Sequence, residues 1–298
     1  MLTNPSIAVA QNRDDSLRML AAQARLYSDV KRDSSIRLVG VAVVAVALAT
    51  ASLVQNDDAK AIGAIGGVIL LFGDGLLMYR ERRRTGLAVS IQETFDCSVF
   101  GLTWNDLAVR SRPSGQQVAK AAARYAGTRT RDWYPDTGTV QRPLDIAICQ
   151  QSNVGWGAPV HRAWAWCAMF LATFVSAVLI GVWEMSGVSA WRGVDALIVP
   201  FVPLAWEAFE NVRHNFESAR EKEETQSLIL TDWAGALSGI TSLSESRCRG
   251  YQDEIVRIRR RNALVPDWFD KCLRGRNEQA MRTTASDMIA EAERVGRA

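Results

Sequence analysis

The sequence predicts a mainly α-helical polytopic membrane protein, with two transmembrane helical hairpins making four crossings and a mostly helical cytoplasmic region. Polar and apolar segments alternate along the 298 residues, the apolar blocks approach the length of a bilayer, and basic residues gather in the segments that four crossings leave on one side. The predicted segments are an N-terminal cytoplasmic helix (1–36), a first hairpin (37–79), a central cytoplasmic region (80–162), a second hairpin (163–209) and a C-terminal cytoplasmic helical region (210–298).

The N-terminal segment is polar over its first 35 residues. Leu17, Leu20 and Tyr27 recur at roughly helical spacing, which predicts an amphipathic helix from Asn12 to Arg32. A cleaved signal peptide has an early apolar core, whereas this segment carries Asp14 near its start. We therefore expect the first apolar block to be retained in the protein.

Three apolar blocks are long enough to cross a bilayer. Leu38–Val54 carries no charge and extends about 26 Å as a helix. Ala61–Tyr79 contains Asp74, and Ala163–Trp183 is a run of 21 residues without a charge. A soluble helix shows a polar stripe every 3.6 residues, and the first and third blocks show none.

The fourth block is shorter, because Asp195 and Glu207 bracket only eleven apolar residues that include Pro200 and Pro203. It is either a crossing or a re-entrant or interfacial segment. Basic residues number six in residues 1–37, twelve in 80–162 and fifteen in 210–298, and one in each of the two short connections. Four crossings place all three basic segments on the cytoplasmic side, as the positive-inside rule requires.

Two charged features adjoin the second block. Arg80, Arg82, Arg83 and Arg84 follow it directly, where anionic lipid on the cytoplasmic leaflet favours basic residues, and we interpret them as a topology anchor. Asp74 lies near the cytoplasmic end of the block between two glycines. Either it reaches interfacial water, or it faces a helix interface or an aqueous path.

Small residues recur at the spacing that brings transmembrane helices together. Gly63 and Gly67 form a G-x-x-x-G pair, and Ala168, Ala172 and Ser176 repeat every four residues. These faces predict close packing, either within one chain or between copies in a homo-oligomer.

The cytoplasmic segments are predicted to be mostly helical. Phe95–Leu102 has the character of a short strand, and Gln116–Tyr125 predicts a helix. After the fourth block we expect a charged helix over Asn211–Thr225, a second helix over Gln226–Ser244 and a basic stretch over Tyr251–Asn262.

Catalytic patterns are missing from the sequence. It has no phosphate-binding loop, no G-x-S-x-G elbow and no H-E-x-x-H, and its only histidines are His161 and His214. The five cysteines show no C-x-x-C spacing, which disfavours a disulfide framework or a zinc site. We expect no enzymatic activity, cofactor or metal, and the net charge of +3 is too small to predict DNA binding.

Two groups of residues suit an anionic, base-containing ligand. Arginine grips phosphate oxygens in pairs, and aromatic side chains stack on bases. The alternatives are that the basic helix contacts anionic lipid and that the aromatic residues build a core. The arginines are Arg257, Arg260 and Arg261, and the aromatic and polar set is Trp104, Asn105, Trp133, Tyr134, Gln150 and Asn153.

Several short motifs, in this order and combined with two hairpins, resemble a known family. They are the segment with Gln11, Asn12, Ala22, Gln23, Arg25, Tyr27 and Lys31; Phe95, Asp96 and Cys97 followed by Trp104 and Asn105; Cys149, Gln150 and Asn153; and Gln252, Asp253, Arg257, Pro266, Asp267, Trp268 and Phe269. The chain resembles the bacterial four-transmembrane effector domain associated with SMODS nucleotidyltransferases and SLOG proteins. It departs from that pattern at Asp270, where an aromatic residue is expected.

The resemblance implies an effector of a cyclic-oligonucleotide antiphage system (CBASS). A partner synthase makes a nucleotide second messenger, and the effector then damages the inner membrane. The distribution of basic residues separately predicts that both termini are cytoplasmic. Two other classes remain open, a small-solute channel or transporter and a membrane scaffold that recruits a cytoplasmic partner. Transporters usually carry repeats or broken helices, to which only Asp74 and the two prolines of the fourth block correspond.

Overall fold

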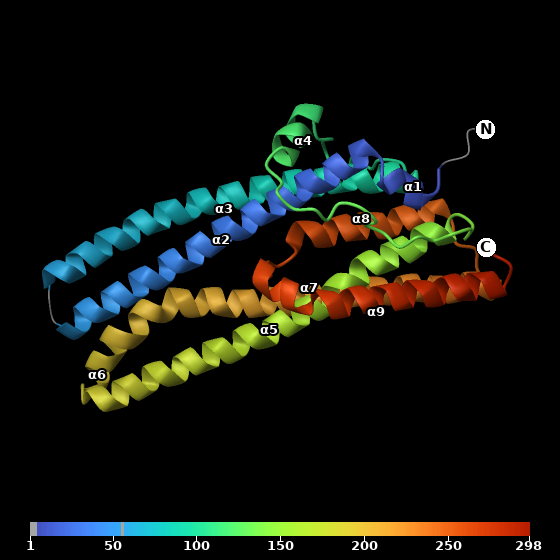
Figure 1. Ribbon diagram of the computed structural model, residues 1–298. Coiled ribbons are helices and arrows are strands. Elements are labelled where there is room, and N and C mark those ends of the chain that lie inside the picture. Colours follow the sequence, from blue (N-terminus) through green and yellow to red (C-terminus); the bar gives the residue numbers. More distant parts are fainter. Residues whose placement is uncertain (1–4, 55–56) are drawn as a thin grey trace.

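The computed structural model describes residues 5–54 and 57–298, and in this part of the chain every regular element is helical. Four long helices run through the molecule, and shorter ones gather around one half of it (Figure 1). The elements are α1 (Ile7–Gln11), α2 (Asp14–Val54), α3 (Asp57–Phe100), α4 (Gly115–Ala122), α5 (Leu144–Ser186), α6 (Ala190–Gly193), η1 (Val194–Ile198), η2 (Val199–Phe201), α7 (Val202–Leu237), α8 (Glu245–Arg261) and α9 (Asp267–Arg294).

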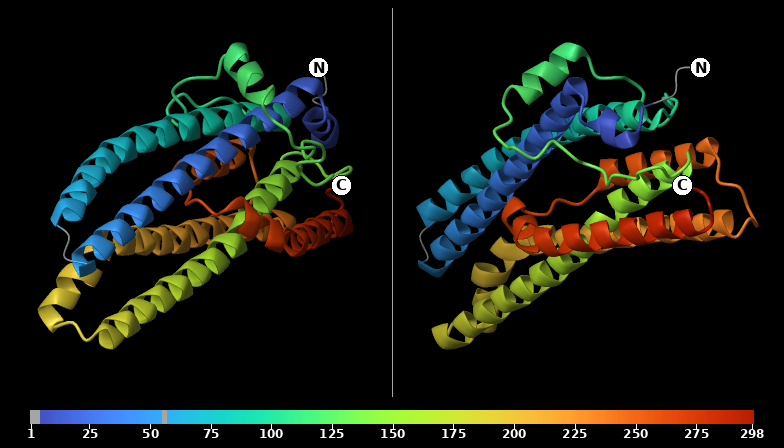
Figure 2. Two further views of the ribbon diagram at one scale, coloured as in Figure 1. Left: turned by 60° about the vertical axis from the view of Figure 1, so that its left-hand side comes forward. Right: turned by 45° about the vertical axis from the view of Figure 1, so that its right-hand side comes forward.

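The long helices form two hairpins, because α2 packs along α3 and α5 packs along α7. The 41 residues of α2 extend about 60 Å, twice the hydrocarbon thickness of a bilayer. Figures 1 and 2 show α1, α4, α8 and α9 around one end of the hairpins, which we call the packed half; the hairpins and α6 alone make up the bare half. The first helix, α1, and the C-terminus both lie at the packed half.

Two helices, α2 and α5, are long and apolar enough to cross a membrane among the residues described. Only 17% of the apolar stretch of α2 and 6% of that of α5 is buried in the protein. A core helix of a soluble protein buries most of its apolar surface, whereas Phe170, Leu171 and Phe174 are exposed here. The prediction of a mainly helical fold with long apolar helices is confirmed, and four crossings remain a prediction.

The fourth apolar block is helical throughout but irregular. The chain passes from the π-helical turn η1 through the 3₁₀ turn η2 into α7. Proline has no backbone N–H, so Pro200 and Pro203 each remove a helical hydrogen bond. The Val199 N–H instead donates to the Val194 carbonyl, and the Val202 N–H donates to the Val199 carbonyl. Both turns pack against α2, which covers the interruption.

The predicted strand at Phe95–Leu102 is wrong. The chain stays helical to Phe100, as the C-terminal end of α3. Phe95 and Val99, whose side chains favour strands, are buried at a spacing of four residues, which places them on one face of a helix. Tertiary packing therefore outweighs local strand propensity here.

Other local predictions are confirmed or simplified. The helix predicted at Gln116–Tyr125 corresponds to α4, which starts with a capping box between Ser114 and Gln117. The two helices predicted at Asn211–Thr225 and Gln226–Ser244 are one helix, α7. The predicted segment boundaries at residues 36, 79, 162 and 209 all lie inside long helices, so no linker marks them.

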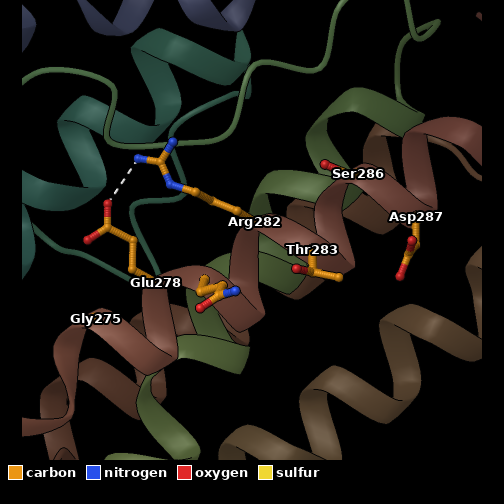
Figure 3. Close-up of a pocket in the computed structure, with 7 residues that line it drawn as sticks. Gly275, Glu278, Arg282, Thr283, Ser286 and Asp287 are labelled. Carbon is orange, nitrogen blue, oxygen red and sulfur yellow. Dashed lines mark hydrogen bonds and ion pairs between the residues drawn. The ribbon is translucent and has the colours of Figure 1, made fainter.

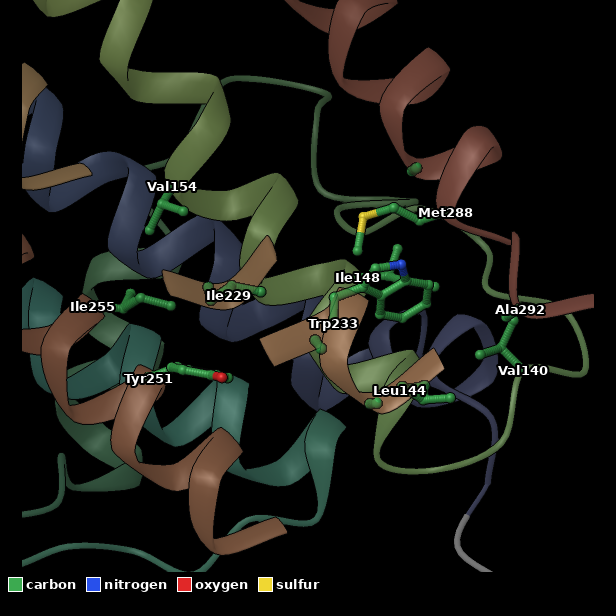
Figure 4. Packing of buried hydrophobic residues seen from close by; sticks show 13 residues of the cluster. Val140, Leu144, Ile148, Val154, Ile229, Trp233, Tyr251, Ile255, Met288 and Ala292 are labelled. Atoms are coloured by element: carbon green, nitrogen blue, oxygen red, sulfur yellow. The ribbon is translucent and has the colours of Figure 1, made fainter. Parts of the chain in front are cut away.

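The hydrophobic core lies in the packed half. Its largest cluster joins α5, α7, α8 and α9 around Trp233 and Tyr251 (Figure 4). The Trp233 ring is 3% exposed, and its N–H donates to Glu291 at 3.0 Å. A second cluster surrounds Phe95 and Tyr134, whose ring centroids are 6.0 Å apart. These clusters hold one end of each hairpin in place.

The G-x-x-x-G pair faces the neighbouring helix of its own hairpin. A Cβ placed on Gly63 would lie 2.6 Å from Leu48 Cδ2, and one on Gly67 would lie 4.0 Å from Val44 Cγ1. Gly63 therefore permits the close approach of α2 and α3. This geometry favours the within-chain alternative for these two glycines.

The small residues of α5 are less covered. Ala168 and Ala172 are half-buried, and Ser176 is exposed, with its hydroxyl donating to the Ala172 carbonyl at 2.9 Å. That hydrogen bond lies within α5, so it satisfies the hydroxyl without a second helix. Their role in association between copies stays a prediction.

Candidate functional site

Residues from the sequence motifs meet in a buried polar network in the packed half, which we call the Asp96 network. Glu93 and Asp96 share a face of α3 because they are three residues apart, and α8 supplies polar groups at spacings of three and seven residues, which also keep one helix face. Glu93, Asp96, Tyr134, Gln150 and Gln252 are at most 3% exposed. The members are Glu93, Asp96, Tyr134, Gln150, Arg249, Gln252 and Arg259.

Asp96 lies at the centre of the network and is fully buried. Its carboxylate accepts hydrogen bonds from the Tyr134 hydroxyl at 2.6 Å, from Gln252 Nε2 at 2.7 Å and from Arg259 Nη1 at 2.5 Å. A buried carboxylate is tolerated only when it is paired and hydrogen-bonded. Asp96 therefore joins α3, the loop after α4 and α8.

Glu93 extends the network by one helical turn. It accepts from Arg249 Nη2 at 2.7 Å and from Gln252 Nε2 at 2.8 Å. Burial, followed by the nearby Asp96 carboxylate, raises the pKa of Glu93 above its ordinary value. Gln150 adds α5, because its amide donates to Gln252 at 3.1 Å and to the Cys248 carbonyl at 2.8 Å.

The Tyr134 phenol in this network and two cysteine thiols beside it are held in their protonated forms. Burial, then Asp96, raises the pKa of the Tyr134 hydroxyl well above its usual value. Burial is also the largest cause that raises the pKa of Cys97 and of Cys248 to about 12. A thiol of that pKa stays protonated at neutral pH and is a poor nucleophile. The arrangement ties four elements together and supplies no activated nucleophile.

The predicted aromatic and polar ligand set is spread around this network. Trp104 packs beneath the Arg112 guanidinium at 5.0 Å, and Asn105 donates to Asp253 on α8 at 2.9 Å. Asn153 donates to the Tyr134 hydroxyl at 3.0 Å. Gln150 is fully buried, so in this conformation its amide makes its hydrogen bonds within the core. Ligand binding by this set remains a prediction.

The predicted arginine set divides into paired and free members. Arg257 binds Glu221 at 2.8 Å on α7 and also Glu254 on its own helix. Two carboxylates thus neutralise its charge. Arg260 and Arg261 are exposed at the end of α8. Because α8 is helical to Arg261, the three arginines share a helix face, with Arg257 engaged in ion pairs, and ligand binding by this set stays a prediction.

A charged layer joins the two hairpins where the packed half meets the bare half. Arg37 on α2 lies 2.7 Å from Glu207 on α7, 3.6 Å from Asp74 and 3.7 Å from Glu81 on α3. One guanidinium therefore faces three carboxylates, which leaves negative charge in excess. Asp74 thus faces α2 within its own chain, and its role at an aqueous path stays a prediction.

A second cluster of arginines, which the sequence reading missed, lies next to this layer on α2. Asp29 Oδ1 is 2.7 Å from Arg25 and 4.0 Å from Arg32, while Asp29 Oδ2 is 3.0 Å from Arg124, beyond α4. One turn further, Asp33 contacts Arg80 at 3.6 Å and also contacts Arg84. We call this set the arginine cluster; its members are Arg25, Arg32, Arg80, Arg84 and Arg124 around Asp29 and Asp33.

Part of the arginine cluster was readable from sequence. Arg25 and Asp29 are four residues apart, as are Arg80 and Arg84, so each pair lies on one helix face. The sequence interpretation assigned Arg80 and Arg84 to topology alone. The convergence of α2, α3 and the residue after α4 depends on tertiary packing.

The tail helix α9 begins beside the same region. Lys31 on α2 pairs with Asp267 at 2.6 Å, and Trp164 on α5 contacts the Trp268 and Phe269 rings at 5.9 and 5.0 Å between centroids. Trp164 supplies aromatic contact across helices. Asp270, where the family pattern suggested an aromatic residue, pairs with Arg274 on α9.

A shallow polar hollow lies on one face of α9. It is lined by Glu278, Arg282, Thr283 and Asp287, and Arg282 pairs with Glu278 at 2.9 Å (Figure 3). The charge of Arg282 is thus already neutralised. Among the residues described, no three His, Cys, Asp or Glu side chains are grouped so as to hold a metal ion.

The fold and these sites define an all-helical protein with two long apolar helices that extend from a polar-networked core. The chain is a member of the SMODS-associating 4TM effector domain family, whose model matches residues 5–288. It is similar to a protein from Bacillus cereus (strain VD146) named probable CBASS effector molecule, at 20% identity over 269 residues that cover 87% of this chain and 90% of that protein. No solved structure matches the chain.

Proposed function

We propose that this protein is the membrane effector of a bacterial antiphage abortive-infection system, activated by a cyclic oligonucleotide to assemble and to disrupt the inner membrane. Membership of the family and the similarity to a probable CBASS effector support the class and a link to a nucleotide synthase. The observation that carries the proposal is the continuity of α2, α3 and α5, each of which runs through both halves without a break. A change of packing around the Asp96 network is therefore passed mechanically to the bare half.

The bare half is the part that we place in the bilayer, with four crossings and both termini in the cytoplasm. The segment from Asp57 to Asp74 of α3 rises about 26 Å, close to the hydrocarbon thickness of about 30 Å. Arg37, Asp74 and Glu207 then lie at the cytoplasmic edge of that layer, where charged groups reach water. The excess of basic residues in the packed half supports this orientation.

A channel of small solutes is the second candidate, favoured by one observation. The turns η1 and η2 interrupt the fourth apolar helix next to α2. Interrupted helices with freed backbone groups often line transport paths. The third class is a membrane scaffold that recruits a cytoplasmic partner. Such a scaffold needs no transport path and leaves membrane permeability unchanged.

The test measures release from vesicles that contain the purified protein. On adding cyclic di- and trinucleotides, we expect rapid release of a small dye, with a gain in oligomer mass. Release of a large dextran as well indicates general bilayer disruption, whereas dye release alone indicates a pore. Dye release that is fast without nucleotide indicates a constitutive channel, and no release with any nucleotide supports the scaffold and contradicts the proposal.

Asp74→Asn is the informative variant in this assay. It keeps the size of the side chain but removes the charge that faces Arg37 at 3.6 Å. We expect equal insertion and accumulation, with nucleotide-triggered dye release altered severalfold, because the charged layer joins the hairpins that must rearrange. Equal release from wild type and Asp74→Asn at matched protein content removes Asp74 from the mechanism.

A further inference from the structure

The arginine cluster holds more positive charge than its own carboxylates neutralise. We propose that it is a binding site for phosphodiester groups, supplied either by a cyclic oligonucleotide or by an anionic lipid headgroup. The inference rests on the proposed function, because it gives the activating nucleotide a place to bind on the first hairpin. Its own evidence is the geometry of Asp29, Asp33 and the five arginines.

Charge and hydrogen-bond counting both leave capacity for an anion. Five guanidinium groups surround two carboxylates, so three positive charges remain. An arginine carries five N–H donors and a carboxylate offers about four acceptor positions, so about 25 donors face about 8 acceptors. Phosphate oxygens are the acceptors that such planar, paired donors fit best.

The cluster is organised before any ligand arrives. Asp29 and Asp33 are each 1% exposed and hold arginines from α2, α3 and the residue after α4. The arginine side chains themselves are 23% to 58% exposed, from Arg84 to Arg32. Buried carboxylates thus fix the guanidinium groups from below while leaving them open to solvent, which lowers the entropy cost of binding.

The surrounding charges favour approach from the packed half. On the bilayer side, Arg37 faces the three carboxylates of Asp74, Glu81 and Glu207, which repel an anion. Exposed Arg82 and Arg83 lie between Arg80 and Arg84 in sequence and add positive charge nearby. Arg257, in contrast, is neutralised by Glu221 and Glu254, so the sequence-predicted arginines are the weaker site.

Depth separates the two sources of phosphate. Asp33 is four residues before Arg37, about 6 Å along α2, and Asp29 is eight residues before it, about 12 Å. The headgroup layer is about 6 Å thick on each side of the hydrocarbon. If the Arg37 layer marks the hydrocarbon edge, Arg80 and Arg84 reach lipid headgroups, while Arg32 and Arg124 lie beyond them and suit a soluble ligand.

The experiment uses the full chain in nanodiscs. It compares wild type with a double variant that carries both Arg32→Ala and Arg124→Ala. Binding of a panel of fluorescent cyclic di- and trinucleotides is measured in neutral phosphatidylcholine discs. Retention of phosphatidylglycerol over phosphatidylcholine is measured separately by native mass spectrometry, with Arg80→Ala plus Arg84→Ala as the second double variant. Arg220→Ala plus Arg282→Ala, two exposed arginines in helix ion pairs, is the matched control.

For a nucleotide site we expect at least tenfold weaker binding in Arg32→Ala plus Arg124→Ala and none of that loss in the control, since each charge-assisted hydrogen bond contributes about tenfold or more. If the double variant aggregates, Arg32→Ala alone serves, because Arg32 lies 4.0 Å from Asp29 and contributes little to the fold. A lipid site predicts instead that wild type and Arg32→Ala plus Arg124→Ala behave alike towards nucleotide and that Arg80→Ala plus Arg84→Ala loses its preference for phosphatidylglycerol.

The outcomes separate this inference from the proposed function. Nucleotide binding and phosphatidylglycerol preference that are both unchanged in the double variants overturn the site and leave the proposed function standing. Lipid-dependent retention without nucleotide binding keeps the site and contradicts nucleotide activation. If wild type neither binds nucleotide nor retains phosphatidylglycerol preferentially, both the site and the proposed function are overturned.

Discussion

At the scale of single residues, the buried carboxylates of the packed half are paired with hydrogen-bond donors. Asp96 has three donors, Glu93 has two and Asp145 is held by Arg142 at 3.2 Å. Removing one partner from such a group strands a buried charge and costs more than the pair contributes. For His161 and Lys222, burial instead lowers the pKa, which favours the neutral form of each side chain.

We predict a pH dependence that comes from His161. It is buried against Asn215, 2.8 Å away, and burial followed by Lys222 lowers its pKa to about 3. The unfolded chain takes up a proton below about pH 6.5, and the folded chain does not until about pH 3. Stability therefore falls as the pH drops through this interval, by about 2 kcal/mol near pH 5.

The measurement compares unfolding of wild type and His161→Gln in detergent at neutral and mildly acidic pH. Wild type is expected to lose about 2 kcal/mol more than the variant between the two. His214→Gln, at an exposed histidine on α7, is the control and should follow wild type. Parallel pH profiles for wild type and His161→Gln would assign the acid sensitivity to other groups.

At the scale of elements, the second hairpin is closed by glycines. The helix α5 stops at Ser186 because Gly187 takes the left-handed conformation, with φ 62°. At the other side of the turn, a Cβ on Gly193 would lie 2.2 Å from Trp183 Nε1 and 2.4 Å from Trp183 Cε2. The close approach of α6 to the end of α5 therefore requires glycine at position 193.

Gly193→Ala is predicted to destabilise this hairpin by about 1 to 3 kcal/mol, because the new methyl group overlaps a rigid indole ring. Gly181→Ala is the matched control on the same hairpin, where nothing lies within 4 Å of the added Cβ. Thermal unfolding of both variants in detergent gives the comparison. Equal midpoints for the two variants would show that Trp183 moves aside at no cost.

At the scale of the whole molecule, the two halves meet different surroundings. The packed half contains the hydrophobic clusters and buried polar networks, while the bare half exposes apolar side chains such as Phe170 and Phe174. Lipid is the environment in which that exposure has no cost. The two halves share their long helices, and the proposed position of the membrane is the bare half, beyond the end of the clusters.

Four crossings predict that both ends of the chain are cytoplasmic. Reporter fusions at Ala298 and at the N-terminus should both read as cytoplasmic, and a reporter placed in the turn at Gly187 should read as periplasmic. The physical reason is that the basic segments of the packed half resist translocation. A periplasmic reading at Ala298 would instead make the fourth block a re-entrant segment.

The sequence by itself determined the class of fold and the family. Long uncharged blocks such as Ala163–Trp183 have few alternatives to a membrane helix, and the order of short motifs identified the effector family. These signals depend on residues that are close together or ordered along the chain, so they can be recognised without a structure. The ligand-binding roles of the site residues stay predictions, with Gln150 buried in the core and Arg257 paired with two carboxylates.

Only the tertiary structure decided which charges meet. Arg25, Arg84 and Arg124 come from three elements, and the nearest two of them are tens of residues apart in sequence, yet they converge on Asp29 and Asp33. Asp96 and Arg259 meet in the same way. Helical periodicity states which face a residue occupies, but which faces pack together depends on all the helices at once, and Coulomb energy depends on those distances.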